Sequence, residues 1–346
     1  MADLSSSHFS EDNLRAFSEV FSMRLNACDP AAPCTGKFIN LVLDFLLPAR
    51  FPLAVRAGED GEKGGRSMGA VEDIDAGVLL FACRAAHVSL YCHGRKRLCA
   101  ACFGSRQTPF TLRCSSCDAV YYCSEACASH HRSRHASVCV LMRCLRKYEL
   151  NKKGRGTKGL DKVSHEMFQG LALLLLALQV LPSSTKDALE ALQEETANWN
   201  DVQRSDYGAV ARCAVSFLRE VAGWDIDQSV AEQWLSRMHL NSFALGNNFG
   251  ALMFSTMSFF NHGCEPNATT IPIDDCQYLF AARPIKAGEE VLTHYIDLEQ
   301  PVQIRRKQLM QSFRFHCECE RCCRESRPSG KKAQKNGRVC EKVKKK

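Results

Sequence analysis

The chain has 346 residues, 45% of them hydrophobic and 24% charged, which is enough for one large domain or two smaller ones with cores of their own. Its net charge is +7, from 45 basic and 38 acidic residues, and residues 331–346 alone carry eight basic residues and one acidic residue. The rest of the chain balances 37 basic against 37 acidic residues, which excludes a globally basic core that binds nucleic acid.

Membrane and secretory signals are missing from the sequence. No run approaches the ~18 apolar residues of a membrane span, and the longest, residues 171–181, contains Gln179 and predicts a buried core helix. The first residues lack the basic and apolar regions of a secretory signal, so we expect an intracellular protein, in the nucleus, the cytoplasm or both. These compartments keep thiols reduced, so the 20 cysteines indicate metal binding rather than disulfides.

Hydrophobic periodicity and turn residues divide the chain into segments with helical or strand patterns. In chain order these are a helical extension (1–50), short strands between glycine-rich turns (51–98), a cysteine-rich insert (99–139), a linker with a helical insert (140–240), more strands and turns (241–300), a second cysteine cluster (301–323) and a basic tail (324–346). The helical insert predicts helices at 165–181, 185–197, 206–222 and 227–238. This order favours one mixed α+β domain that carries two insertions over a row of independent domains.

The cysteine-rich insert offers eight candidate metal ligands in four closely spaced pairs. Gaps of two or three residues let both side chains of a pair reach one tetrahedral ion. Eight ligands make two closed sites, which indicates structural zinc, because a catalytic zinc keeps one position open for water. The pairs are Cys99 with Cys102, Cys114 with Cys117, Cys123 with Cys127, and His135 with Cys139.

With Tyr122 before its third pair, this insert resembles a MYND zinc finger. The resemblance implies interleaved ligation, with the first and third pairs on one ion and the second and fourth pairs on the other. MYND fingers act as protein-interaction modules that take proline-containing peptides, and some contact DNA; the basic residues Arg132 and Arg134 permit either partner. His130 and His131 are near misses of the ligand pattern and are interpreted as exposed helix residues.

Four short motifs lie outside this insert, in a fixed order. They are Gly65-Arg66-Ser67-Met68-Gly69, Asn241-Ser242-Phe243, Asn261-His262-Gly263-Cys264-Glu265-Pro266-Asn267, and Gly288-Glu289-Glu290 with the following His294-Tyr295. Together they resemble a SET domain, the β-rich, pseudoknotted fold of protein-lysine methyltransferases. A SET domain split by a MYND finger and a helical insert is the architecture of the SMYD family, and the resemblance covers roughly residues 50–323.

The resemblance implies a protein-lysine N-methyltransferase that uses S-adenosylmethionine (SAM). The residues carried over as SAM-binding are Gly65, Arg66, Asn241, Asn261, His262, Tyr295 and Phe315. Asparagine and histidine can hydrogen-bond the cofactor's amine, carboxylate and adenine without adding net charge, and Phe315 is expected against the adenine. Tyr295 is the candidate catalytic residue, because its hydroxyl would align the lysine amine with the methyl group.

A third zinc site is expected after the last strands. Cys317, Cys319 and Cys322 have ligand spacing and need one distant cysteine to close a tetrahedron. The resemblance supplies Cys264 as that ligand in a post-SET zinc site, so three zinc ions are expected in all. The cysteines outside these sites are not needed for the chemistry.

Two positions depart from the family pattern. Ser67 stands where a second glycine is usual, and that glycine allows a positive φ and a close backbone approach to the cofactor. His239 stands where an acidic residue is frequent, so one cofactor contact is expected to be missing. These departures leave a second hypothesis open, a catalytically weak or inactive adaptor that recruits partners through the zinc finger.

Partners are predicted only by class. The substrate is a protein or peptide with a target lysine, histone or non-histone, and the sequence fixes neither its identity nor the number of methyl groups added. The basic tail has three readings, which are a nuclear-import signal, a weak contact with nucleic acid or acidic partners, and a solvated end without a specific role. No membrane partner is expected.

Overall fold

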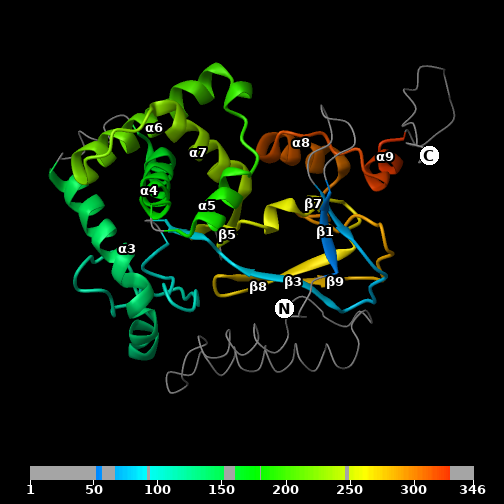
Figure 1. Cartoon of the computed structure of the whole chain (residues 1–346), viewed down its shortest axis with the longest axis horizontal. Coiled ribbons are helices and arrows are strands. Elements are labelled where there is room, and N and C mark those ends of the chain that lie inside the picture. Colours follow the sequence, from blue (N-terminus) through cyan, green and yellow to red (C-terminus); the bar gives the residue numbers. More distant parts are fainter. Residues whose placement is uncertain are drawn as a thin grey trace.

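The computed structural model of the chain describes residues 52–56, 67–91, 94–151, 160–179, 181–245 and 249–327. The predicted helical extension at 1–50, the tail from residue 328, and Gly65 and Arg66 lie outside the described residues. Within the described part, a helical lobe lies on one side and short strands lie beside it (Figure 1). No helix there combines the length and the apolar character that crossing a membrane requires.

The strands come from both ends of the described sequence and pair with each other. They are β1 (Leu53–Arg56), β2 (Ser67–Ala70), β3 (Leu79–Arg84), β4 (His87–Leu90), β5 (Ser242–Leu245), β6 (Gly250–Met253), β7 (Asn261–His262), β8 (Ala268–Ile273), β9 (Cys276–Ala281) and β10 (Leu292–Thr293). Antiparallel pairing gives the orders β1-β2, β3-β9-β8 and β4-β6-β5, and β7 pairs with β10 in parallel. Because β3 and β4 pair with β9 and β6, the two strand segments form one β unit interrupted by insertions, as predicted.

The helices make up the inserted part and the end of the described chain. They are α3 (Glu125–Asn151), α4 (Lys162–Ala177), α5 (Ser183–Glu190), α6 (Asp201–Ala222), α7 (Gln228–Asn241), α8 (Val302–Phe313) and α9 (Glu320–Glu325), with 3₁₀ turns η1 (Thr196–Asn198) and η2 (Met257–Phe259). α6 starts earlier than predicted because Asn200 and Gln203 form a reciprocal capping box, and it ends at Ala222, where Gly223 with a φ of 69° caps it.

One predicted helix, at 185–197, is wrong in its second half. α5 ends at Glu190, and the chain then turns so that Leu189 and Leu192 are both buried in the helical core. Beyond the turn, the carbonyl of Gln193 accepts a hydrogen bond of 2.9 Å from the side chain of Asn241. This contact between distant segments holds residue 193 off a helical path, and helical periodicity alone does not predict it.

The core of the helical lobe is built on the apolar run of α4. Phe168, Leu171 and Leu174 have no exposed surface there, and they pack against α6 and α7. The buried helix predicted for this run is therefore confirmed. A separate core under the strands includes Phe254 and Phe260, which are also almost fully buried.

Helix α3 connects the cysteine-rich insert to both neighbouring parts. Its 27 residues span about 40 Å and cross the boundary predicted at residue 139. Leu145 and Tyr148, near its end, pack in the helical core. Nearer its start, Arg134 forms an ion pair with Asp275 in the turn between β8 and β9, and Asp275 is 1% exposed. Arg134 therefore ties α3 to the β8–β9 turn, while 40% of its side chain stays exposed.

Candidate functional site

A cavity of about 470 Å³ lies where the helical lobe meets the strands. Its wall includes every described residue among those predicted to bind a cofactor, namely Asn241, Asn261, His262, Tyr295 and Phe315. These side chains come from the end of α7, from β7, and from the segments after β10 and α8. Four distant parts of the chain thus build one cavity, whose volume is typical of small-molecule sites.

A buried amide ties two of the sequence motifs together behind this cavity. Asn267, 1% exposed, donates hydrogen bonds to Glu289 Oε1 at 3.0 Å and to the carbonyl of Glu290 at 2.8 Å. Its Oδ1 accepts the backbone N–H of Leu292 at 2.7 Å. This seam lies beside the parallel pair that sets Leu292 opposite Asn261. The motif at residues 261–267 and the motif at residues 288–290 thus satisfy polar groups of each other.

His262 joins the cavity to the cysteines. Its Nδ1 accepts the backbone N–H of Tyr295 at 3.1 Å, so the ring proton lies on Nε2, which is 3.2 Å from Cys264 Sγ. Burial lowers the pKa of His262 to about 4, and the charges of His294 and Arg305 act in the same direction. The ring is therefore neutral at physiological pH and adds no positive charge to the cavity.

Tyr295 is held on several sides. Its hydroxyl donates to the carbonyl of Phe260 at 2.8 Å, and its ring centroid lies 4.8 Å from that of Phe313 and 6.4 Å from that of Phe315. Burial, and then the negative charge of Glu290, raise the pKa of Tyr295 above its ordinary value. The phenol stays protonated at neutral pH and serves as a fixed hydrogen-bonding group rather than as a base.

The two asparagines have different surroundings. Asn261 Nδ2 donates to Glu290 Oε1 at 2.9 Å, which orients the amide at the cavity wall. Asn241 Nδ2 donates to the carbonyls of Gln193 and Arg237, both at 2.9 Å. Asn241 therefore also fixes the helical lobe against the cavity, a structural role that its motif alone does not predict.

Sequence reasoning missed several residues of the wall. They are Gln193, Glu195, Leu240, Ser242, Phe243, Ala244, Ser258, His294, Phe313 and Arg314. Phe243, Ser258 and Phe313 lie within or beside the motifs, so their spacing was a usable signal. Gln193 and Glu195 carried none, because they reach the wall only through the turn that follows α5.

The two departures from the expected pattern have local explanations. Ser67 lies in β2 and is not among the described residues with positive φ. The backbone conformation at this position therefore does not require a glycine. His239 lies on the wall of a smaller neighbouring cavity, with its ring centroid 5.7 Å from that of Tyr207. Glu195 and Arg314 line both cavities, so an acidic side chain reaches this region from another segment.

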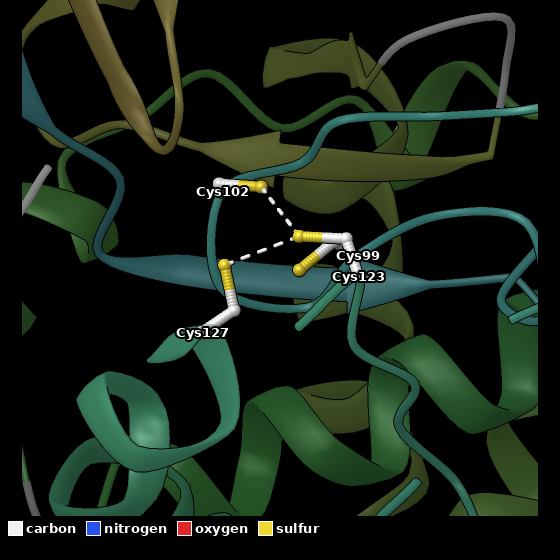
Figure 2. A group of neighbouring side chains, drawn as sticks. All are labelled: Cys99, Cys102, Cys123 and Cys127. Carbon is white, nitrogen blue, oxygen red and sulfur yellow. Dashed lines mark hydrogen bonds between the residues drawn. The ribbon is translucent and has the colours of Figure 1, made fainter. Parts of the chain in front are cut away.

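Three sets of four cysteine or histidine side chains converge in the described part of the chain, with the ligand atoms of each set within 4.8 Å of one another. They are Cys99, Cys102, Cys123 and Cys127 (Figure 2); Cys114, Cys117, His135 and Cys139; and Cys264, Cys317, Cys319 and Cys322, called the third cluster below. The first two sets have the interleaved pairing that the MYND resemblance implies.

The geometry of these sets fits zinc. A tetrahedral ion with zinc–sulfur bonds of about 2.3 Å holds its sulfurs about 3.8 Å apart. Sulfur-to-sulfur distances are 3.3 and 3.7 Å in the first set, 3.7 Å in the second, and 3.4 and 3.9 Å in the third, which brackets this value to within about 0.5 Å. Each set offers four protein ligands, which suits closed structural sites rather than catalytic ones.

The interpretation of His131 as an exposed helix residue is wrong. Its ring stacks on that of His135 with centroids 5.5 Å apart, and its Nδ1 lies 3.2 Å from the Tyr122 hydroxyl. It is half-buried and braces a predicted zinc ligand, whereas its neighbour His130 is exposed as expected. Helical periodicity does not reveal this packing, because Tyr122 precedes the helix.

Comparisons with known proteins identify the family of this chain and several relatives. The SET domain family model matches residues 65–296. The human N-lysine methyltransferase SMYD2 is 25% identical over 279 residues, which cover 77% of this chain and 60% of that protein. The human histone-lysine N-methyltransferase SMYD3 is 25% identical over 271 residues, which cover 75% of this chain and 59% of that protein. The SET domain and MYND-type zinc finger protein 6 of Schizosaccharomyces pombe is 22% identical, covering 75% and 50%.

The chain therefore spans three fifths or less of the length of these curated relatives. Among solved structures, the SET domain of LSMT bound to lysine and AdoHcy aligns with 83% of this chain and 57% of its own, at 12% identity and a TM-score of 0.36. The structure of Rubisco LSMT bound to AdoMet aligns over the same shares, at 12% identity and a TM-score of 0.35.

Proposed function

Because the chain belongs to the SET domain family and is related to SMYD2 and SMYD3, we propose that it is a SAM-dependent protein-lysine N-methyltransferase. The observation that carries this proposal is the convergence of Asn241, Asn261, His262, Tyr295 and Phe315 on one cavity. The chemical character of the cavity lining suits SAM, since it combines uncharged hydrogen-bonding groups with aromatic rings.

Bound SAM supplies a methyl group on a sulfonium, and its transfer to an amine needs no protein nucleophile. The chain must provide a neutral, aligned lysine. A free lysine has a pKa of about 10.4, so about one in 10³–10⁴ is neutral at pH 7. Phe243, Phe313 and Phe315 would exclude water from the amine, and the positive charge of bound SAM disfavours an ammonium beside it, so both effects increase the neutral fraction.

Tyr295 is proposed to align that amine. Its proton is committed to the carbonyl of Phe260, so its oxygen lone pairs are left to accept an N–H of the substrate. An amine held in this way can direct its own lone pair towards the methyl group. The neutral ring of His262 fixes the backbone of Tyr295 without repelling the sulfonium.

The zinc-binding parts complete the proposal. Three structural zinc ions would fill the three sets, and the zinc finger would bind a proline-containing peptide of a partner protein. The substrate is proposed to be a lysine of a histone or a non-histone protein, in the nucleus or the cytoplasm. The basic tail is proposed to act as an import signal or to contact nucleic acid.

The test is transfer of radiolabelled methyl from SAM to purified histones and to a whole-cell protein extract. The proposal predicts label on lysine with the natural protein and almost none with Tyr295→Phe. A folded, zinc-loaded preparation that transfers no label to either mixture would contradict the proposal and favour the adaptor hypothesis. The adaptor hypothesis rests on the departures at Ser67 and His239, and two observations weigh against it, namely that Ser67 has no positive φ and that Glu195 lines the cavity beside His239.

A further inference from the structure

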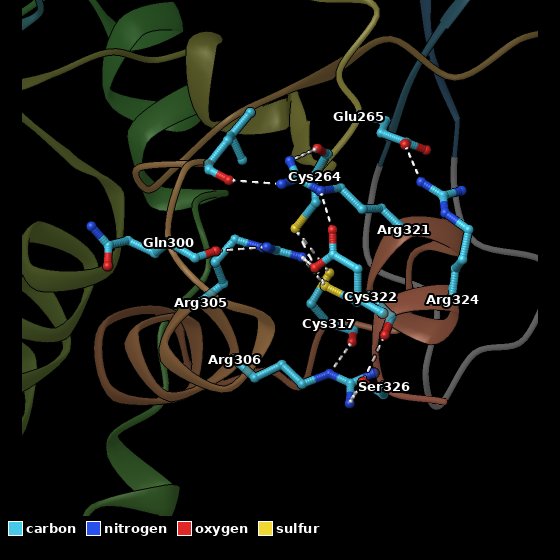
Figure 3. A network of polar contacts seen from close by, with 12 residues as sticks. Cys264, Glu265, Gln300, Arg305, Arg306, Cys317, Arg321, Cys322, Arg324 and Ser326 are labelled. Carbon is cyan, nitrogen blue, oxygen red and sulfur yellow. Dashed lines mark hydrogen bonds and ion pairs between the residues drawn. The ribbon is translucent and has the colours of Figure 1, made fainter. Parts of the chain in front are cut away.

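A buried arginine lies against the third cluster. Arg305, on α8, has 1% of its side chain exposed. Its Nη1 donates to the carbonyl of Gln300 at 2.7 Å, and its Nη2 donates to Glu325 Oε2 at 2.8 Å and lies 3.4 Å from Cys322 Sγ (Figure 3). A guanidinium removed from water in this way needs negative charge nearby.

The carboxylate of Glu325 does not supply enough negative charge to balance Arg305. Glu325 is one-third exposed, and Arg321 also donates to it, through Nε to Oε1 at 2.7 Å. Two arginines thus share one carboxylate, which leaves one positive charge to be balanced. Four neutral thiols would not balance it, whereas four thiolates around one Zn²⁺ carry two negative charges. Arg305 therefore has its full counter-charge when the third cluster holds a metal ion.

Two more arginines hold the backbone of the cluster. Arg321 Nη1 donates to the carbonyl of Cys264 at 3.1 Å, and Arg306 Nε donates to the carbonyl of Cys317 at 2.9 Å. These contacts fix the ligands from outside, and Figure 3 shows Arg305, Arg306 and Arg321 gathered around Cys264, Cys317 and Cys322. Arg306 and Arg321 contact ligand carbonyls, whereas Arg305 reaches a ligand sulfur.

The same cluster touches the cavity through one side chain. Cys264 Sγ lies 3.2 Å from His262 Nε2, and His262 Nδ1 accepts the backbone N–H of Tyr295. A metal-bound thiolate is a better acceptor than a thiol for the Nε2 proton. The charge state of the cluster therefore bears on the ring that positions Tyr295.

We propose that Arg305 is a positioning residue that stabilises the metal-bound third cluster by balancing its negative charge, and that it thereby keeps His262 and Tyr295 in place. The effect on zinc holds whether or not the chain is an enzyme. The effect on the cavity rests on the proposed function.

The test compares zinc-loaded natural protein with Arg305→Met and Arg305→Lys. Zinc release to a chromogenic chelator is followed over time, and binding of S-adenosylhomocysteine is measured by calorimetry. Methionine keeps much of the volume and removes the charge, whereas lysine keeps the charge and loses the forked donors. The matched control is Arg324→Ala, on neighbouring α9, where Arg324 forms an exposed ion pair with Glu265.

We expect Arg305→Met to release one of its three zinc ions about 10-fold faster, with the other two unchanged, and to bind S-adenosylhomocysteine correspondingly more weakly. Arg305→Lys should fall between that variant and the natural protein, and Arg324→Ala should match the natural protein. If Arg305→Met does not fold, the rate of zinc release from Arg305→Lys tests the inference instead. Release at the natural rate in the folded Arg305 variants overturns the inference. Faster release without S-adenosylhomocysteine binding, even by the natural protein, overturns the proposed function instead.

Discussion

The hydroxyl of Tyr295 has one fixed orientation, which suits its proposed role of aligning the substrate amine. The hydroxyl is fixed by the carbonyl of Phe260, and the Tyr295 ring lies beside the rings of Phe313, Phe315 and His262. Removing the oxygen takes away the acceptor for the substrate amine but leaves the aromatic packing. Substrate alignment should therefore suffer more than the cavity itself.

Tyr295→Phe is accordingly expected to lower kcat about 100-fold, while the Kd for SAM stays within about threefold of the natural value. Steady-state kinetics and calorimetry measure the two quantities separately. Tyr207→Phe, which changes the wall of the neighbouring small cavity, serves as the matched control and should change neither. A kcat for Tyr295→Phe close to the natural one would remove Tyr295 from the mechanism.

The pH profile follows from the raised pKa of Tyr295. Because that pKa lies above its ordinary value of about 10, the phenol remains protonated throughout the range from pH 7 to 9. The substrate amine, by contrast, becomes neutral as the pH rises. We therefore expect kcat/KM to rise by about tenfold per pH unit across this range, as measured in initial-rate assays. A fall between pH 7 and 9 in protein that keeps its zinc would contradict this assignment.

At the scale of elements, Asn267 is the residue that joins the segment after β7 to the turn before β10. Its side chain satisfies Glu289, the carbonyl of Glu290 and the N–H of Leu292. Asn267→Ala leaves two buried backbone groups without partners, so we expect it to lower the free energy of unfolding by about 2–4 kcal/mol. Chemical denaturation measures this change, and Gln311→Ala, at an exposed position on α8, is the control. A loss of unfolding free energy below about 0.5 kcal/mol would show that the hydrogen bonds of the Asn267 side chain are not essential to stability.

Helix α3 is expected to respond to zinc in only part of its length. Cys127, His135 and Cys139 lie at or before residue 139, near its middle, whereas Leu145 and Tyr148 beyond them are buried in the helical core. Tyr148 also donates to Ser216 on α6 at 3.3 Å. After chelation, hydrogen exchange should become at least about 100-fold faster over residues 125–139 and change little over 143–148. Equal acceleration along the whole helix would contradict this division.

The elements that the sequence predicted well are those whose signals are local. The apolar run of α4, the paired cysteines and the motif that contains Asn261 and His262 each lie within a few residues of one another. The parts that it missed depend on distant contacts. α5 ends early where Asn241 holds the carbonyl of Gln193, and His131 is covered by a tyrosine outside its helix. Periodicity reports which face is apolar, but it does not report which distant group covers that face.

At the scale of the whole molecule, one β unit is interrupted by the cysteine-rich insert and a helical lobe (Figure 1), and the helical lobe contributes to the cavity. The helical lobe supplies Asn241 and Glu195 to the wall, and the third cluster braces His262 from the other side. The order of segments predicted this plan, because strand patterns on both sides of the insertions imply strands that pair across them. The contribution of Glu195 could not be predicted, because it depends on how the lobe docks.

The most direct measurement of the central claim is mass spectrometry of cell-extract proteins incubated with SAM that carries a deuterated methyl group. We expect deuterated methyl groups on lysine side chains with the natural protein, and their loss with Tyr295→Phe, while both proteins bind SAM and hold their zinc. Deuterated methyl groups confined to residues other than lysine, or equal labelling by the two proteins, would contradict this claim.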